Sequence, residues 1–392
     1  MATRRTFFAA SVARVERRYC QFASLVLGQA SRFAMQACAV AILISVGASI
    51  PRAEVQQPGV TRYNVVTYAT IQDPGDSAVV RRINIHGEIA AGFKRPGIRR
   101  TFSALLVTPA QLTEIAADQP ADYATANDVN DAGEVVGSFN SDTALRPFRS
   151  LRGAGFQPLP VLPRDTGGAA FAINSRGEAV GYSSGPGGLR AVWWNRAGAI
   201  TLLPALPAAS TTRALGINNV GDIVGTAGDA VKRGVLWRGK GNIIDLGTLP
   251  GFTGSEARSI NEQGAIIGIA TRTVDTRNLT RAVLWGPAGQ PIRDLGSLSP
   301  DGISRAYDIN ARGEVVGSSS SADGDRAFIW TAASGMVDLN TLLTSSDLHL
   351  TEALGINDNG HIVAIGHDVL NEAPGDHDDH EQPKRVVVLI PI

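Results

Sequence analysis

The feature that constrains this chain most is a segment in which asparagine is followed by glycine three residues later. It recurs seven times, at intervals of 43 to 49 residues. The seven asparagines are Asn84, Asn130, Asn174, Asn218, Asn261, Asn310 and Asn357. Five copies carry another glycine seven residues after the asparagine, whereas the first copy has Gly92 and the last has Ala364. Such a period predicts one structural unit used seven times.

Each Asn-x-x-Gly segment predicts a tight turn between two strands. Asparagine at the first position of a turn bonds to the backbone two residues on, and glycine supplies the positive φ that closes a type I turn with a bulge. The flanking residues favour strands, as in Ala-Leu-Gly-Ile before a turn and Glu-Val-Val-Gly after one. We therefore interpret the asparagines as turn residues and not as ligands.

Two more strands are predicted in each period. The first of them begins with arginine and continues apolar to tryptophan, in the segments Arg190–Trp194, Arg233–Trp237, Arg281–Trp285 and Arg326–Trp330, with weaker copies at Arg100, Arg146 and Arg385. The other ends in Asp-Leu-Gly-Thr-Leu or a variant, at Asp245–Leu249, Asp294–Leu298 and Asp338–Leu342, with degraded copies near 110–116, 156–162 and 199–203.

Four short strands in about 45 residues predict the blade of a β-propeller. The fold expected is all-β: a seven-bladed propeller of four-stranded antiparallel blades over residues 62–392. A β-solenoid is the alternative, but its coils are usually shorter. The first strand, Arg62–Ala69, and the last, Arg385–Ile390, each lack a partner within their own period. Pairing these two would complete the seventh blade and remove both open edges.

The repeat resembles the HAF repeat family of bacterial proteins, whose members are expected to be extracellular. Arg326-Ala327-Phe328-Ile329-Trp330 and Ala353-Leu354-Gly355-Ile356-Asn357 match two of its submotifs closely. The resemblance covers nearly all of 62–392, although the first two blades lack the tryptophan. It implies export and a repeat architecture, and it implies no reaction.

Residues 1–48 predict a secretory signal, followed by a linker at 49–61. Six arginines and one glutamate precede or flank an apolar run, Phe33–Ile50, and Val46-Gly47-Ala48 fits a cleavage site. Cleavage would place the protein in the periplasm or outside the cell, and an uncleaved membrane anchor is the alternative. Arg4 and Arg5 leave a twin-arginine route open, and translation from Met35 is another possibility.

Composition excludes several kinds of chemistry. The formal net charge is zero, which disfavours a nucleic-acid binder with a basic surface. The chain's two cysteines, Cys20 and Cys38, both lie in the predicted signal, so the body contains no disulfide, zinc-binding CxxC motif or cysteine nucleophile. No nucleophile elbow, HExxH motif, P-loop or dinucleotide fingerprint is present.

One polar segment is a candidate metal site. The stretch His367–Glu381 contains His367, Asp376, His377, Asp378 and His380, and histidines beside carboxylates can bind a divalent ion. The spacing matches no known ligand set, and a solvated acidic loop is the alternative interpretation. No other cofactor is predicted.

If the asparagine strand is innermost, the Asn-x-x-Gly turns share one face and the longer connections share the other. Variable loops on a rigid scaffold commonly carry recognition, so the long-connection face is the candidate binding surface. The seven repeat arginines could bind an anion there or, as the structural alternative, bond to carbonyls of the neighbouring strand or blade. We expect a non-catalytic binding module for an envelope polysaccharide or a protein; the alternative is a glycan-active hydrolase or lyase that uses carboxylates at the channel. The oligomeric state is left open.

Overall fold

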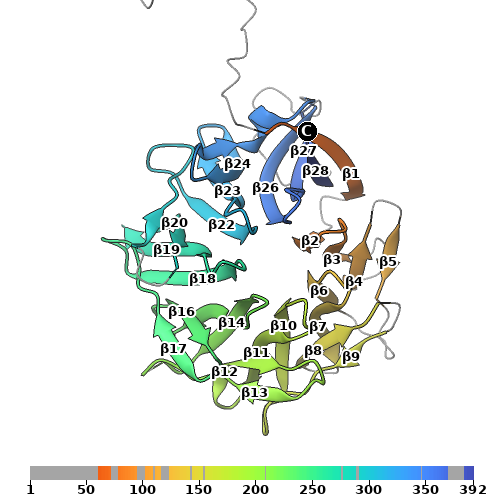
Figure 1. The fold of residues 1–392 in the computed structure, drawn as a ribbon, viewed down its shortest axis with the longest axis vertical. Coiled ribbons are helices and arrows are strands. Elements are labelled where there is room, and N and C mark those ends of the chain that lie inside the picture. Colours follow the sequence, from red (N-terminus) through yellow and green to blue (C-terminus); the bar gives the residue numbers. More distant parts are fainter. Residues whose placement is uncertain are drawn as a thin grey trace, which may run out of the picture. The chain divides into compact units, whose positions relative to one another are not determined.

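The computed structural model describes residues 61–71, 78–94, 102–108, 111–115, 123–141, 144–152, 155–207, 209–274, 277–287, 291–345, 347–369 and 384–392. They form seven four-stranded antiparallel sheets arranged as blades of a ring (Figure 1). The fold is the seven-bladed β-propeller that the repeat predicts. The predicted signal segment lies outside these residues, as does the predicted linker apart from Thr61. Within the described ranges, no helix has the length and apolar character that crossing a membrane requires.

The strand nearest the axis in each blade ends directly before a repeat asparagine, as the sequence predicts. These innermost strands are β2 (Ala78–Ile83), β6 (Ala124–Val129), β10 (Gly167–Ile173), β14 (Thr212–Ile217), β18 (Gly254–Ile260), β22 (Ser304–Ile309) and β26 (Leu348–Ile356).

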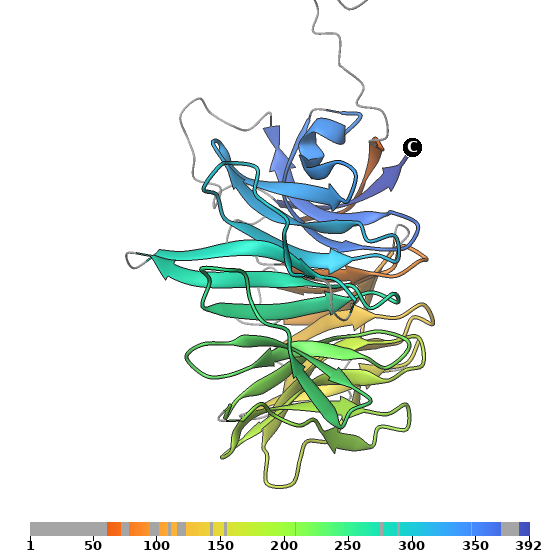
Figure 2. The same ribbon diagram turned by 60° about the vertical axis from the view of Figure 1, so that its left-hand side comes forward.

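Each innermost strand pairs with a second strand, which pairs with a third. The second strands are β3 (Ile89–Lys94), β7 (Val135–Ser141), β11 (Ala179–Gly185), β15 (Ile223–Ala227), β19 (Ile266–Val274), β23 (Val315–Ser321) and β27 (Ile362–Asp368). The third strands are β4 (Phe102–Val107), β8 (Ala144–Ser150), β12 (Gly188–Trp194), β16 (Arg233–Arg238), β20 (Arg277–Trp285), β24 (Gly324–Thr331) and β28 (Lys384–Pro391). Figure 2 shows the long β19–β20 hairpin, in teal, extending past its neighbours.

The outermost strands are short in six blades, where they are β5 (Leu112–Glu114), β9 (Gln157–Pro158), β13 (Ile200–Leu202), β17 (Asn242–Asp245), β21 (Arg293–Asp294) and β25 (Gly335–Asp338). A 3₁₀ helix, η1 (Leu339–Leu342), follows β25. In the seventh blade the outermost strand is β1 (Tyr63–Ile71), which pairs antiparallel with β28. The N-terminal and C-terminal strands therefore close the ring, as expected from their unpaired edges.

The turns after the innermost strands have the expected geometry. Gly177, for example, has a φ of 74° and donates its backbone N–H to the carbonyl oxygen of Asn174, at 3.0 Å. The glycines of the other six turns also have positive φ. Because L-residues rarely adopt this conformation, glycine at this position fixes the end of each hairpin.

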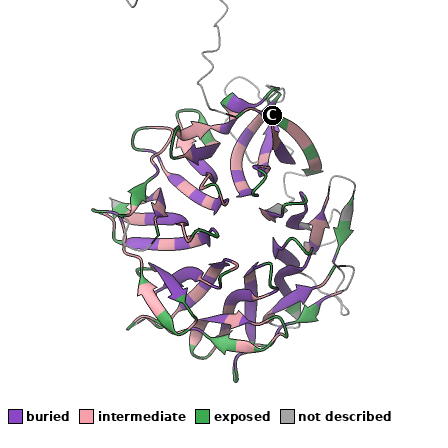
Figure 3. Ribbon diagram, in the orientation of Figure 1, coloured by how far each residue is buried: buried purple, intermediate pink, exposed green. Residues whose placement is uncertain are grey.

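The hydrophobic core lies between adjacent blades. Figure 3 shows buried residues concentrated on the inner strands and exposed residues on the outer ones. Trp194 and Trp237 are fully buried, and their indole nitrogens donate to the carbonyl oxygens of Pro160 and Pro204 in the preceding blades, at 2.8 and 2.7 Å. The tryptophan that ends the third strand therefore joins its blade to the one before it through both apolar contact and a hydrogen bond.

The second glycine of the repeat has a packing role. A Cβ atom on Gly225 would lie 1.9 Å from the carbonyl oxygen of Arg213, and one on Gly181 would lie 2.0 Å from that of Ala169. In each case the carbonyl belongs to the innermost strand, which is displaced by a β-bulge just beyond it. The glycine is thus required by the close approach of two backbones.

Candidate functional site

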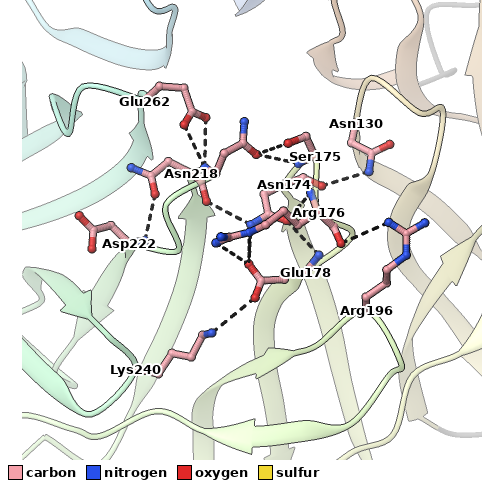
Figure 4. Close-up of polar contacts among 11 residues, drawn as sticks. Asn130, Asn174, Ser175, Arg176, Glu178, Arg196, Asn218, Asp222, Lys240 and Glu262 are labelled. Atoms are coloured by element: carbon pink, nitrogen blue, oxygen red, sulfur yellow. Dashed lines mark hydrogen bonds and ion pairs between the residues drawn. The ribbon is translucent and has the colours of Figure 1, made fainter.

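The seven repeat asparagines form a closed ring of hydrogen bonds at the ends of the innermost strands. The side-chain amide of each one donates to the backbone carbonyl oxygen of the asparagine in the next blade, at 2.8 to 3.2 Å. Figure 4 shows Asn130, Asn174 and Asn218 from three consecutive blades. The side of the ring where these turns lie is here called the asparagine face.

In four of the seven repeats, a glutamate four residues after the asparagine accepts the second N–H of its side-chain amide. In the third blade, Asn174 Oδ1 accepts the backbone N–H groups of Arg176 and Glu178, at 3.1 and 2.9 Å. Its Nδ2 also donates to Glu178 Oε2, at 2.8 Å. A buried amide with all of these partners has no remaining donor for a ligand. The asparagines are structural, in agreement with their interpretation as turn residues.

The residues that face the axis come from a β-bulge that recurs in every innermost strand. In β10 the pairing with β11 shifts between Ala170 and Ala172, so Phe171 lies opposite no residue of β11. The same shift in β22 leaves Tyr307 without a paired residue in β23. A bulge re-aims side chains relative to the regular alternation of a strand. The bulge residues that line one common cavity are Arg81, Asn127, Phe171, Leu215, Arg258, Tyr307 and Leu354.

Polar side chains one residue beyond the bulge meet at the centre of the ring. Arg82 forms an ion pair with Asp308, which comes from β22, and its Nη2 donates to Ser259 Oγ at 3.1 Å. Ser259 Oγ in turn donates to Asp308 Oδ1, at 2.9 Å. Between these blades, β26 carries Gly355, whose Cβ would lie 3.3 Å from Arg82 Cα. The absence of a side chain there leaves room for Arg82 to reach across.

A second buried carboxylate, Asp128, lies near this group. It accepts the backbone N–H groups of Val129 and Ile173, each at 2.9 Å. Burial raises the pKa of Asp128 to about 6, although the Arg82 guanidinium acts to lower it. We call Arg82, Asp128, Ser259 and Asp308 the throat.

The throat separates two cavities, both of which Arg82 lines. The narrow cavity, of about 190 Å³, opens on the asparagine face. Besides the throat carboxylates Asp128 and Asp308, three acidic residues lie in its lining, Asp131, Glu262 and Asp358. Backbone groups engage them: Glu262 accepts the N–H of Asn219 at 3.1 Å, and Asp358 accepts that of Ala311 at 2.7 Å. These carboxylates therefore serve the contact between blades.

The wide cavity, of about 510 Å³, lies on the other side of the throat, toward the long connections. Aromatic and apolar side chains form part of its lining, including Phe171 and Tyr307. The Arg258 guanidinium lies 5.5 Å from the centre of the Tyr307 ring. Behind the lining, the ring of Tyr182 lies 5.5 Å from that of Phe171. This volume is within the range of about 300–1,000 Å³ that is typical of small-molecule pockets.

Charged groups of both signs also line the wide cavity. Arg258 Nε donates to Glu256 Oε1 at 2.7 Å. Glu352 is half-buried, and its burial raises its pKa, with a further contribution from Asp325. Arg81 is exposed. The wide cavity can thus offer hydrogen-bond donors, acceptors and aromatic surface to one ligand.

The repeat arginines lie elsewhere. The six within the described residues stand on the third strands and line neither cavity. Arg385 pairs with Asp368 at 2.6 Å, and Arg233 pairs with Asp245 at 3.1 Å. Arg190 and Arg326 also pair with carboxylates, whereas Arg281 donates to the Ser297 hydroxyl. For these five arginines structural bonding is observed, but the partners are side chains and not the strand carbonyls that we expected.

The predicted metal ligands are placed only in part. His367 lies in β27, is buried, and has its ring centre 4.7 Å from that of His349. Asp376, His377, Asp378 and His380 lie outside the described residues. Among the residues that are described, no group of three or more histidine, cysteine or acidic side chains could hold a metal ion. The metal site stays a prediction.

Sequence reasoning identified the innermost strand but missed the residues that line its cavity. In the motif Ala-x-x-Ile-Asn, the two variable positions are the bulge residue and the throat residue. They carry Phe and Ala in one repeat, Arg and Ser in another, and Tyr and Asp in a third. Variation at two adjacent positions inside an otherwise regular strand was the available signal.

Comparison with known proteins supports the fold alone. No protein-family model matches the chain, and no curated protein matches it in sequence. A puromycin-hydrolysing peptidase of Mycobacterium tuberculosis is 14% identical, with a TM-score of 0.54 over 77% of this chain and 50% of that one. A puromycin hydrolase is also 14% identical, with a TM-score of 0.53 over 79% of this chain and 54% of that one. This chain thus spans about half the length of these two proteins.

Proposed function

We propose that this protein is an exported binding module that holds part of a polysaccharide in the wide cavity. The observation that carries the proposal is the mixed lining of that cavity, with Phe171, Tyr307, Arg258, Glu256 and Glu352 on four of the innermost strands. Aromatic and apolar surface packs against the faces of sugar rings, while carboxylate and guanidinium groups bond to hydroxyls. Strands closed into a ring hold such groups in place before the ligand arrives.

Export is part of the proposal and is supported by the sequence. The arginine-rich start, the apolar run and the small residues near Ala48 are typical of a secretory signal. The protein would then act in the periplasm or outside the cell. Retention by the apolar run as a membrane anchor is the alternative.

The binding test uses the purified protein and immobilised neutral and acidic polysaccharides. We expect retention of the protein without release of new reducing ends, and weaker retention of a Tyr307→Ala variant. A matched control is Phe252→Ala, which changes an aromatic residue outside the cavity lining. Equal retention of both variants would contradict the use of the wide cavity. Failure to bind any polysaccharide would reject the glycan ligand and leave a protein partner as the alternative.

An enzyme is the second candidate, and the observation that favours it is the raised pKa of Glu352. A glycan hydrolase needs a protonated carboxyl as general acid and a second carboxylate nearby, and Glu256 lines the same cavity. The release of sugar ends in the same experiment separates the two functions. Release that Glu352→Gln abolishes, with binding retained, would establish the enzyme and overturn the binding module.

A further inference from the structure

Among the described residues that line the wide cavity, one cation has no partner. Arg81 lies at the bulge of β2 and is exposed in the cavity. Within the described part of the chain, its guanidinium forms neither a hydrogen bond nor an ion pair. Arginine carries five donors and stays protonated at neutral pH, so this side chain is available to an anion.

The two other arginines of the lining are matched by acidic partners. Arg258 donates to Glu256, and Arg82 pairs with Asp308 in the throat. Although Arg81 is open to the cavity, the surrounding protein desolvates its guanidinium, which lowers the pKa of Arg81, and repulsion by Arg258 and Arg82 lowers it further, against the opposing effect of the nearby tyrosines. An anion beside Arg81 would relieve this repulsion, because it would be attracted by all three charges.

The cavity chemistry favours a carboxylate over a phosphate. A guanidinium pairs with either group through two parallel hydrogen bonds. Glu256 and Glu352 lie in the same lining, however, and repel a doubly charged group more strongly than a singly charged one. The ligand group that fits this balance best is a single carboxylate.

The rest of the lining indicates what carries that carboxylate. Phe171 and Tyr307 offer ring faces, and the carboxylates of Glu256 and Glu352 accept hydrogen bonds from hydroxyl groups. An acidic sugar has a carboxylate, several hydroxyl donors and apolar ring faces in one unit. The last residue of a peptide has a carboxylate but few donors for two glutamates, so the lining favours the sugar.

The throat limits how such a ligand can enter. Arg82 borders both cavities and is held by Asp308 and Ser259, so the wide cavity ends there. Arg81 precedes Arg82 in the chain and therefore lies toward this closed end. A ligand chain that ends at the throat would place its terminal residue beside Arg81.

We propose that the wide cavity binds the terminal uronate of an acidic polysaccharide, with Arg81 paired to its carboxylate. This inference rests on the proposed function, whose ligand class it narrows. In this arrangement Arg81 contacts the ligand directly, and the aromatic rings of Phe171 and Tyr307 provide the surface on which the sugar packs.

The test measures binding of short oligogalacturonate and of its uncharged galactose counterpart by titration calorimetry. We expect the acidic oligosaccharide to bind more tightly, and Arg81→Gln to weaken it about 10- to 100-fold, as the loss of a charge-assisted pair does. Arg81→Lys should restore part of the affinity, because it keeps the charge without the planar pair of donors. The matched control is Arg277→Gln, which removes an exposed arginine on the β19–β20 hairpin outside the cavity.

The outcomes separate this inference from the function it rests on. Equal binding of the acidic and neutral oligosaccharides, or no effect of Arg81→Gln, would overturn the uronate inference and leave the polysaccharide module in place. Binding of neither sugar would overturn both. A short peptide with a free C-terminal carboxylate that binds more tightly than the oligogalacturonate would replace the sugar with a peptide ligand. Circular dichroism of each variant checks that the fold is retained.

Discussion

The side-chain amide of Asn357 donates to the backbone carbonyl oxygen of Asn84, 2.8 Å away and 273 residues earlier in the chain. This contact joins the last repeat to the first on the inner side of the ring. On the outer side, β1 pairs with β28 in the same blade. The ring is thus closed twice, by strand pairing at the rim and by a side chain near the axis.

Asn357→Ala should weaken this closure. The substitution removes the donor to Asn84 and the acceptor of two backbone N–H groups, those of Asn359 and His361. Loss of buried hydrogen bonds of this kind costs about 2–3 kcal/mol of unfolding free energy, measured by urea denaturation. Val220→Ala, at an exposed position in the turn of another blade, should change it by less than about 0.5 kcal/mol. Equal effects of the two substitutions would contradict a role for the ring of asparagines.

Gly225→Ala tests the close approach of the two inner strands. The new Cβ would meet the carbonyl oxygen of Arg213 at 1.9 Å, and backbone atoms of the same strand lie just beyond it. We expect a loss of about 3 kcal/mol or more in unfolding free energy, because the backbone must move. Gly241→Ala is the control, since nothing lies within 4 Å of its added Cβ. A tolerated alanine at 225 would show that the bulge can relax.

Trp237→Phe isolates the hydrogen bond between blades from the apolar contact. Trp237 donates to Pro204, whereas the indole N–H of Trp285 has no partner among the described residues. Both side chains are buried. Trp237→Phe should therefore cost about 1 kcal/mol more than Trp285→Phe in thermal or chemical unfolding. If Trp285→Phe cost more unfolding free energy than Trp237→Phe, apolar packing and not the hydrogen bond would account for the stabilisation.

Arg82→Met should destabilise the throat, because it leaves the buried charge of Asp308 without its partner. The expected loss is about 3 kcal/mol. Arg326→Met, which breaks a pair with the exposed Asp323, should cost less than about 1 kcal/mol. Adding Asp308→Asn to Arg82→Met should recover part of the stability by removing the uncompensated charge. No recovery in the double variant would argue that Arg82 acts by filling space.

Asp128 should make stability depend on pH. Its pKa is raised from 3.8 to about 6, so the folded state holds the proton more tightly than the unfolded state does. Stability therefore rises as pH falls through 6, and the gain between about pH 7.5 and pH 5 is about 1 kcal/mol. The charged groups that act on Asp128 are Arg82 and Asp308.

The measurement compares the unfolding free energy of the wild type with that of Asp128→Asn across this pH range. The variant has no carboxyl group to protonate at this position. The difference in unfolding free energy between the two proteins should therefore change by about 1 kcal/mol between about pH 7.5 and pH 5. A constant difference would mean that Asp128 titrates below pH 5 in the folded protein.

The fold was largely predictable because its signals are local. The turn after each innermost strand needs only an asparagine and a glycine three residues apart, and both act within their own hairpin. The unpaired first and last strands also predicted how the ring closes, since each needs one edge partner. The role of the second glycine was harder to predict, because it depends on how closely the carbonyl oxygen of the neighbouring strand approaches.

The candidate site could be predicted only as far as its face. The sequence placed the candidate binding surface on the side of the long connections, and the wide cavity opens toward that side. Binding at this surface stays a prediction. It did not single out Arg81, Phe171 or Tyr307, because a bulge shifts them out of the regular alternation that reveals which side chains face a sheet surface. The repeat arginines attracted attention by their regular spacing, yet Arg233 and Arg385 form ion pairs within their own blades, outside both cavities.

By itself, the sequence determined the number of repeats, the four strands of each blade and the residues of each turn, since these depend on interactions within about 45 residues. Only the tertiary structure decided which side chains meet at the axis. Arg82 and Asp308 are 226 residues apart in the chain. They form an ion pair because ring closure brings the first and sixth blades close enough for the Arg82 side chain to reach Asp308. No local pattern encodes that distance, so the cavity and its throat exist only in the closed ring.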